Sequence, residues 1–425
     1  MPRRWFIIVI TMLDCLILLT GCTGNQDSTT PFEHEEVTLR VAVNNERSFH
    51  DRYGQMLELF YPNLTVELID EGYYEAYRNG TWSEWIEEHR PDLFISAAPS
   101  IYSELSTQGL FVALDPLIQT EHYDLDAFIP AVTEQLRNNA NRELYGLATH
   151  FQSSAIFYHK QKFDERSIPY PVEKRSWEEL LALAAEFASA DGTRYGLAIQ
   201  GTDNPFQLVL MIGETEGLDF LSADDTEAWF RSQGWIKVWQ LVLDAVNRQI
   251  VKWDPQAHGF PEDAAMFIGD EQMVRDLSGN SALLDIWGMA PYPANPVDPE
   301  RSNVLQVRNI ISIVSSSPNR EHAWELLKIL TAESVARYGG MAFGHDGLWT
   351  RKTLLPANMP GLEAMYEWKP APASPPKPSE LVQFVMQAGH NTFLDLLENG
   401  LPLEDALTKL DTETNEFLAR TNDEP

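Results

Sequence analysis

Cysteine is nearly absent from this chain of 425 residues, which contains only Cys15 and Cys22. Cys15 lies in the mostly apolar run 5–19, which follows two arginines and includes one aspartate. This run is shorter than the ~20 residues that a membrane-spanning helix needs, so it predicts a signal peptide instead. Removal of that peptide would leave Cys22 as the only cysteine, and no intramolecular disulfide could then form.

The end of this run, Leu19-Thr20-Gly21-Cys22, resembles the bacterial lipobox, in which the peptide is cleaved before a cysteine that carries lipid. We expect residues 1–21 to be a lipoprotein signal peptide and Cys22 to be lipidated; the alternative is a signal peptide that is cleaved elsewhere. Residues 22–36 are polar and lack periodicity, which predicts a flexible tether. The protein is therefore expected on the extracellular face of a bacterial cell membrane, anchored by lipid.

Basic residues are also scarce, because 31 Lys and Arg stand against 63 Asp and Glu and give a formal net charge of −32. Such a charge repels phosphate backbones and argues against a nucleic acid as a partner. The acidic residues are spread along the chain rather than gathered in one run, so they indicate solubility and do not identify a ligand.

Motifs of catalysis and cofactor binding are missing. The chain has no Gly-x-Ser-x-Gly elbow, no Gly-x-Gly-x-x-Gly, no phosphate-binding loop, no His-Glu-x-x-His and no metal-ligand cluster. His345-Asp346 alone is a weak indication of catalysis. We therefore expect neither a cofactor nor an enzymatic reaction. No internal repeat of solenoid length is present either.

The N-terminal part alternates between strand and helix patterns. Strands are predicted at 37–43, 64–69 and 91–95, and helices at 53–60 and 82–88. This order favours an α/β lobe with a largely parallel sheet. Ligands of such sheets bind beyond the carboxyl ends of the strands, so the loops 44–46 and 96–100 are expected to form one wall of a cleft.

The same alternation continues further along the chain and predicts a second α/β lobe. Ser176-Trp177-Glu178-Glu179 is a capping box that starts a helix, a strand follows at 195–199, and another amphipathic helix covers 235–246. Beyond the proline-rich loop 291–299, the pattern predicts a strand at 309–314 and a helix at 320–330. A second proline-rich break, 369–378, precedes a helical C-terminus.

The stretch 143–160 stands at the centre of this arrangement. An apolar segment, 144–147, and a strand-forming segment, 155–158, flank a polar interval that contains Thr149, His150 and Gln152. A polar interval between strands suits a chain that leaves one lobe, crosses a ligand cleft and enters another. The alternative is an ordinary strand, loop and strand within one domain.

These segments resemble the family 1 extracellular solute-binding proteins, the ligand receptors of ABC importers, mostly for sugars. The resemblance covers nearly the whole mature chain, and its motifs occur in the family's order. They are Pro91-Asp92-Leu93-Phe94, Leu114-Asp115, Leu144-Tyr145-Gly146-Leu147, Phe157-Tyr158-His159-Lys160, Ser176-Trp177-Glu178-Glu179-Leu180, Tyr195-Gly196-Leu197, Ala265-Met266-Phe267-Ile268-Gly269, Trp287-Gly288-Met289-Ala290-Pro291 and Ala323-Trp324-Glu325-Leu326-Leu327-Lys328.

The resemblance implies two α/β lobes that close on a ligand like a hinge. Each lobe is then discontinuous: the N-terminal lobe takes 37–147 with 310–365, and the C-terminal lobe takes 148–309 with 366–425. A monomer is expected. The implied partners are a small ligand, a mono- or oligosaccharide, and the permease subunits of an ABC transporter.

Candidate ligand contacts follow from these positions, since sugar sites combine aromatic faces with planar polar groups. They are Asn44, Ser96, Gln152, Asn204, Phe206, Glu271, Trp287 and Trp349. Ordinary loop polarity is the alternative for Ser96, Gln152, Asn204 and Phe206, core packing is the alternative for Trp287, and packing of a surface loop on its own lobe is the alternative for Trp349. Many relatives carry a tryptophan where Asp270 and Glu271 stand here, which allows a cationic or heavily hydroxylated ligand.

Three functions remain open from the sequence. The first is a lipid-anchored receptor that captures a small solute and delivers it to an importer. The second is an extracellular subunit that reports ligand occupancy to a membrane signalling protein. The third is a carbohydrate hydrolase, which needs two carboxylates ~5 to 9.5 Å apart in a cleft.

Overall fold

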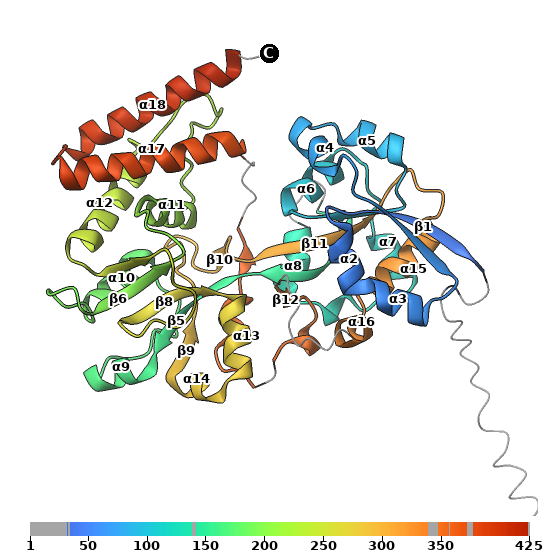
Figure 1. Cartoon of the computed structure of the whole chain (residues 1–425), viewed down its shortest axis with the longest axis horizontal. Helices are drawn as coiled ribbons and strands as arrows, with labels where there is room; N and C mark the ends of the chain where they lie inside the picture. The colour runs from blue at the N-terminus through green and yellow to red at the C-terminus, as the bar shows by residue number, and fades with distance from the viewer. Residues whose placement is uncertain are drawn as a thin grey trace, which may run out of the picture.

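The protein consists of two mixed α/β lobes, each built around its own sheet (Figure 1). The computed structural model describes residues 32, 35–137, 142–338, 347–356, 358–371 and 377–423. The expected signal peptide, Cys22, most of the expected tether and the pair His345-Asp346 lie outside the described residues. Within those ranges, every helix is too short or too polar to cross a membrane.

The first lobe contains a six-stranded sheet with the order β12-β4-β11-β3-β1-β2. Its strands are β1 (Val37–Ala42), β2 (Leu64–Ile69), β3 (Leu93–Ser96), β4 (Gly146–Gln152), β11 (Gln306–Ile313) and β12 (Leu348–Trp349). β1 pairs in parallel with β2 and β3, whereas β11 pairs antiparallel with β3 and β4, and β12 antiparallel with β4. The expectation of a largely parallel sheet is therefore wrong for this lobe, because strands from distant parts of the chain complete it in the opposite direction.

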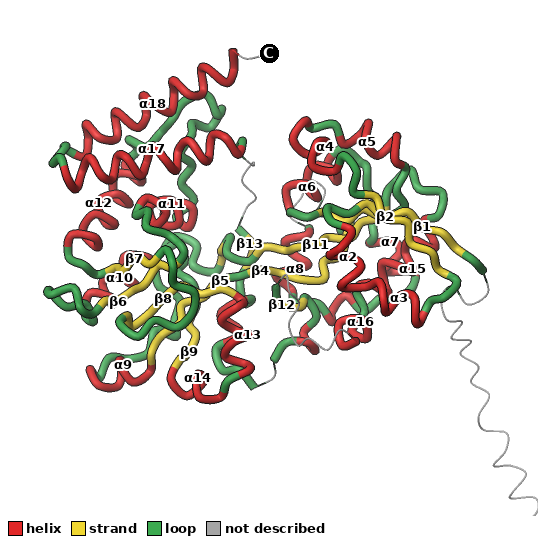
Figure 2. Tube along the Cα trace, in the orientation of Figure 1, coloured by secondary structure: helices red, strands yellow, loops and turns green. Residues whose placement is uncertain are grey.

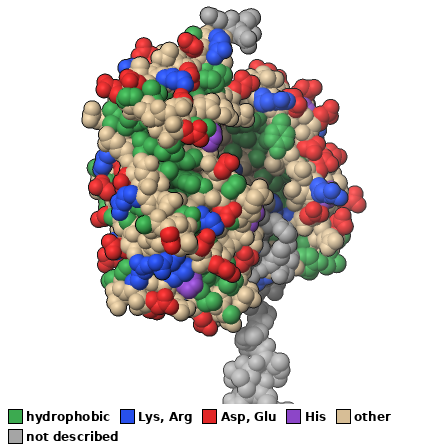
Figure 3. Space-filling view, turned by 60° about the vertical axis from the view of Figure 1, so that its left-hand side comes forward, with side chains coloured by type: hydrophobic (Ala, Val, Ile, Leu, Met, Phe, Trp, Pro, Cys, Tyr) green, Lys and Arg blue, Asp and Glu red, His purple; other side chains and the backbone are tan. Residues whose placement is uncertain are grey.

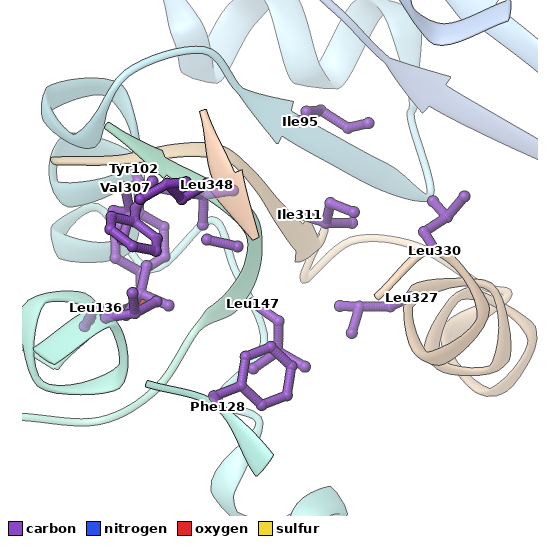
Figure 4. Packing of buried hydrophobic residues seen from close by; sticks show 14 of the residues in the cluster. Ile95, Tyr102, Phe128, Leu136, Leu147, Val307, Ile311, Leu327, Leu330 and Leu348 are labelled. Carbon is purple, nitrogen blue, oxygen red and sulfur yellow. Dashed lines mark hydrogen bonds between the residues drawn. The ribbon is translucent and has the colours of Figure 1, made fainter. Parts of the chain in front are cut away.

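Helices cover both faces of this sheet. They are α2 (Glu46–Phe49), the π-helical η1 (His50–Gly54), α3 (Gln55–Phe60), α4 (Tyr73–Asn79), α5 (Trp82–His89), α6 (Pro99–Thr107), α7 (Asp115–Thr120), η2 (Leu125–Ala127), α8 (Pro130–Leu136), α15 (Arg320–Leu330) and α16 (Glu333–Tyr338). Figure 4 shows Leu327 and Leu330 of α15 in the same buried cluster as Ile311 of β11 and Leu147 of β4. Leu147 thereby packs in one core with residues more than 150 positions later in the chain, and this apolar packing fixes the inner strands of the sheet.

The second lobe contains a five-stranded sheet with the order β7-β6-β8-β5-β9. Its strands are β5 (Ser154–His159), β6 (Tyr195–Gln200), β7 (Val251–Asp254), β8 (Ala264–Asp270) and β9 (Trp287–Ala290). Its helices are α9 (Lys160–Arg166), α10 (Trp177–Ala185), α11 (Phe206–Thr215), α12 (Gln233–Asn247), α13 (Glu271–Gly279), α14 (Ser281–Ile286), α17 (Ser379–Glu398) and α18 (Leu403–Asp423). The capping box at Ser176 is confirmed, since Ser176 and Glu179 exchange both hydrogen bonds at the start of α10. The long helices α17 and α18 lie together over α11 and α12 (Figure 2).

The chain passes between the lobes three times. β4 belongs to the first sheet and β5 to the second, with only Ser153 between them, so the crossing predicted in 143–160 is confirmed. A second passage leads from β9 through the short strand β10 (Arg301–Ser302) to β11. The third leads from β12 through η3 (Lys352–Leu354), η4 (Leu362–Met365) and β13 (Lys369–Pro370) to α17, and β13 pairs in parallel with β10.

The predicted lobe boundaries 147/148 and 309/310 fall inside β4 and β11. Phe151 pairs with Val307 and Gln152 pairs with Gln306, so these strands stay in the first sheet beyond both boundaries. We therefore propose that the first lobe extends to Gln152 and resumes at Gln306.

Candidate functional site

A polar pocket of about 370 Å³ lies in the first lobe, at the ends of the strands and against the crossing. Its walls come from the loop after β1, from α2 and η1, from both sides of the end of β3, and from β4 and β11. The lining residues are Val43, Asn44, Asn45, Ser48, Phe49, Arg52, Ile95, Ala97, Gln152, Arg308 and Asn309. The space-filling view shows the surface hollowed between the two lobes (Figure 3). The predicted cleft wall thus contributes Asn44, Asn45 and Ala97 to one pocket.

Two asparagines after β1 shape one side of this pocket. Asn45 caps α2, because its side-chain oxygen accepts a hydrogen bond of 2.8 Å from the backbone N–H of Ser48. The side-chain amide of Asn44 lies 3.5 Å from the hydroxyl of Tyr74, the second residue of α4. The ring of Tyr74 is 54% exposed, so an aromatic face stands free beside the polar wall.

Gln152 and Arg308 form the other side, where β4 and β11 reach the second lobe. The Nε of Arg308 donates a 2.8 Å hydrogen bond to the side-chain oxygen of Gln152. One terminal nitrogen of Arg308 also lies 3.4 Å from the side-chain oxygen of Gln306. The guanidinium is thus oriented by neutral amides, which leaves its positive charge uncompensated by these two partners.

Asn309 interrupts the regularity of β11 beside this pair. Its φ of 52° lies in the left-handed region, which residues with side chains rarely adopt and which asparagine tolerates better than most. Residues on both sides of it, Arg308 and Ile310, keep their pairing with β4. The distortion is therefore confined to one residue that lines the pocket, as is common at ligand sites.

A buried row of side chains lies next to the pocket. His150 of β4 pairs with Arg308 of β11 on one side and with Trp349 of β12 on the other. The rings of His150 and Trp349 have centroids 4.1 Å apart, and they are 0% and 9% exposed. Nδ1 of His150 lies 2.8 Å from the hydroxyl of Thr149.

This environment keeps His150 neutral. Burial first, and then the positive charge of Arg52, hold the pKa of the imidazole well below its usual range. Among the described residues, neither Nε2 of His150 nor Nε1 of Trp349 has a hydrogen-bond partner. Trp349 is therefore packed on its own lobe, which is the alternative that the sequence left open beside a ligand contact.

Ser96 and Glu271 lie near the crossing without lining the pocket. Ser96 is fully buried at the end of β3, between the lining residues Ile95 and Ala97. Glu271 begins α13 and is 8% exposed, and burial raises the pKa of its carboxyl group. A hydrogen bond from the backbone of Ser153 acts in the opposite direction, so Glu271 stands against the crossing residue itself.

Three other predicted contacts lie elsewhere in the second lobe. The side-chain oxygen of Asn204 accepts from the backbone N–H of Phe206, and its amide lies 3.3 Å from the Met386 carbonyl of α17. Phe206 is fully buried against Trp239, with ring centroids 5.3 Å apart. Both residues hold α11 in place, and Phe206 is buried away from the pocket at the crossing.

Trp287 lies at the end of the second sheet that is remote from the crossing. It pairs with His159, the last residue of β5, and is 4% exposed. It lines a separate pocket of about 630 Å³ between β9 and η4. The structure therefore does not bring Trp287 together with Gln152.

Sequence reasoning also missed several polar residues of the pocket lining, namely Ser48, Arg52, Arg308 and Asn309, and the neighbouring Tyr74. Asn309 begins the strand predicted at 309–314 and Arg308 lies just before it, so the missing information was that this strand starts earlier, at Gln306, and pairs with the crossing strand β4. No group of three or more His, Cys, Asp or Glu side chains that could hold a metal ion occurs among the described residues.

Two α/β lobes, three passages between them and a polar pocket against the passages define a two-lobed binding protein of the periplasmic type. The amino-acid sequence supports this class of protein, because the family model described as bacterial extracellular solute-binding protein matches residues 48–337. The chain belongs to this family of binding proteins. No curated protein matches the chain in sequence.

Solved structures share the fold at low sequence identity. The sugar-binding protein MalE from Xanthomonas citri is 19% identical, with a TM-score of 0.63 over 91% of this chain and 98% of that one. A family 1 extracellular solute-binding protein from Alicyclobacillus acidocaldarius has a TM-score of 0.66 at 14% identity, over 90% and 99%. A solute-binding protein of an ABC transporter from Agrobacterium vitis, with bound D-mannitol, has a TM-score of 0.57 at 17% identity, over 90% and 99%.

Proposed function

We propose that the protein is an extracellular receptor, lipid-anchored through Cys22, that captures a small saccharide and delivers it to an ABC importer. The observation that carries this proposal is the pocket of about 370 Å³ against the crossing. The pocket is lined by the side-chain amides of Asn44, Asn45, Gln152 and Asn309. An amide can both donate and accept hydrogen bonds. Such groups suit the rim of hydroxyls on a sugar, and the exposed ring of Tyr74 suits its apolar face.

The fold relatives support the solute class. MalE from Xanthomonas citri is described as sugar-binding, and the protein from Agrobacterium vitis holds a sugar alcohol, D-mannitol. Sugars and sugar alcohols carry many hydroxyl groups, which suit the amide-rich pocket of this chain. We propose that the protein binds its solute as a monomer and catalyses no reaction on it.

Binding is proposed to close the lobes about Ser153 and the start of β11. A ligand held in the first-lobe pocket would draw the second lobe onto it, because the passages between the sheets are short. The best ligand would be found by a thermal-shift screen of mono- and oligosaccharides, since binding to the native state raises its stability. Small-angle scattering with that ligand should then show a smaller radius of gyration, and an unchanged radius at saturation would contradict closure.

Gln152→Ala tests the pocket directly. Loss of a hydrogen bond whose partner stays buried costs about 1 to 3 kcal/mol, so binding measured by calorimetry should weaken about 5- to 150-fold. Gln200→Ala provides a matched control, because Gln200 ends β6 in the second lobe and bonds to Gly259. An unchanged affinity of Gln152→Ala would remove the crossing from the proposed site.

A further inference from the structure

The charged side chains among the described residues of the pocket lining are basic, whereas the chain as a whole is acidic. The whole sequence has a net charge of −32, with about two acidic residues for every basic one. Among the eleven described residues that line the pocket, Arg52 and Arg308 are the charged ones, and neither Asp nor Glu occurs. Two arginines and no carboxylate in this described part of the lining stand out in so acidic a chain.

The surroundings of Arg308 hold it ready for an anion. Its side chain is partly buried, and its hydrogen bonds go to the amide oxygens of Gln152 and Gln306. None of the described carboxylates forms an ion pair with it, although arginines elsewhere pair with acidic groups, as Arg231 does with Asp411. Since neutral amides fix the guanidinium without neutralising it, its planar fork can receive two oxygens of an anionic group.

Arg52 adds a second positive charge from another element. It comes from η1 and lines the same pocket, and it lies close enough to His150 to lower the pKa of that imidazole. The charges on Arg52 and Arg308 therefore come from two separately anchored segments that converge on one space. The amides of Asn44 and Asn45 lie in the same pocket and remain suited to hydroxyl groups.

We propose that the captured solute is an anionic saccharide, whose acidic group binds to the guanidinium of Arg308. A uronic acid carries this charge as a carboxylate and a sugar phosphate carries it as a phosphate, and a guanidinium recognises both. The inference rests on the proposed function, because it specifies which saccharides the same pocket takes.

The acidic residues Asp270 and Glu271 do not belong to the described lining of this pocket. Asp270 caps α13, where its carboxylate accepts a 2.9 Å hydrogen bond from the backbone N–H of Gln272. Glu271 is buried against Ser153 rather than in the pocket lining. The cationic ligand that Asp270 and Glu271 suggested in place of a tryptophan is therefore not the one that this pocket favours.

The test compares matched ligands on the full chain by calorimetry. The panel contains galactose, galacturonic acid, the uncharged methyl ester of galacturonic acid, galactose 6-phosphate, and the neutral and acidic disaccharides of the same sugars. The variants are Arg308→Gln and, as a control with the same change of charge, Arg248→Gln, an exposed residue at the C-terminal end of α12. Melting temperatures of the free proteins confirm that both variants are folded.

We expect an acidic saccharide to bind at least tenfold more tightly than its neutral counterpart or its ester, and to lose at least tenfold in Arg308→Gln but not in Arg248→Gln. Its affinity should also fall with rising salt. A preference for galacturonic acid or for the 6-phosphate tells the two anionic groups apart. If neutral sugars bind as tightly as acidic ones, the inference is overturned while the proposed function stands; if no saccharide binds, both are overturned.

Discussion

The indole of Trp349 lies on the imidazole of His150, with ring centroids 4.1 Å apart, and the two residues pair across β12 and β4. Because the indole is 9% exposed, Trp349→Ala should leave a cavity at the edge of the first sheet. We expect the free energy of unfolding to fall by about 3 kcal/mol, measured by chemical denaturation.

Trp229 provides the control for this substitution, since it is 52% exposed and its truncation should change stability by less than about 0.5 kcal/mol. A Trp349→Ala variant with unchanged stability but weakened saccharide binding would show that the indole contacts the ligand, as its position in the sequence suggested.

Acid should destabilise the protein through His150. The folded state keeps this imidazole neutral far below pH 6.5, whereas the unfolded chain protonates it near that value. The unfolded state then binds more protons, so stability falls as the pH drops below about 6.5, by at most ~1.4 kcal/mol per pH unit. In His150→Phe, the loss of stability between pH 7.5 and 5.5 should be smaller than in the wild type by about 1 kcal/mol.

The exposed residue His258 serves as the control for this pH experiment. His258→Phe should keep the full wild-type dependence on pH. If His150→Phe keeps it as well, His150 is not the group that confers the acid sensitivity.

Tyr74 should contribute to binding and little to folding. Its ring is 54% exposed and its hydroxyl lies 3.5 Å from the amide of Asn44, at the edge of the pocket. Tyr74→Ala should weaken saccharide binding about fivefold, the equivalent of about 1 kcal/mol for a stacked ring. Tyr77→Ala, one turn further along α4 and 41% exposed, should bind like the wild type. Equal effects of the two substitutions on calorimetric affinity would argue against a stacking role.

Cys22 is predicted to carry the membrane anchor. The lipobox-like Leu19-Thr20-Gly21-Cys22 and the polar residues after it motivate this expectation. Cys22→Ser should release the protein from the membrane fraction of the cells, because a lipid chain supplies the affinity for the bilayer. The prediction fails if the variant remains as firmly bound to membranes as the wild type.

Local patterns predicted many elements of the fold well. The strand expected at 64–69 is β2 and the helix expected at 320–330 is α15, with the same bounds. Both have a clear apolar period and clear ends, so local chemistry suffices. The helix expected at 53–60 begins earlier, at Glu46, and runs through α2 and the π-helical turn η1 into α3; no apolar period reveals that turn.

The site was harder to predict because it depends on partners far away in the chain. Gln152 could be proposed from the crossing alone, but its neighbour Arg308 is 156 residues away and became visible only with the pairing of β4 and β11. The burial of Phe206 was hard to predict for the same reason. It follows a polar loop, yet α17 covers it at Gly389, where a side chain would collide with its ring.

The position of β11 in the first sheet also governs the order in which the protein can fold. β11 lies between β3 and β4, so these two strands, both made early, have no direct pairing with each other. A ribosome must add more than 150 further residues after Gln152 before β11 is complete at Ile313. Until then β3 and β4 both lack their shared neighbour β11. Their unpaired edges are prone to wrong contacts. The first lobe therefore cannot complete its sheet until most of the second lobe has been synthesised.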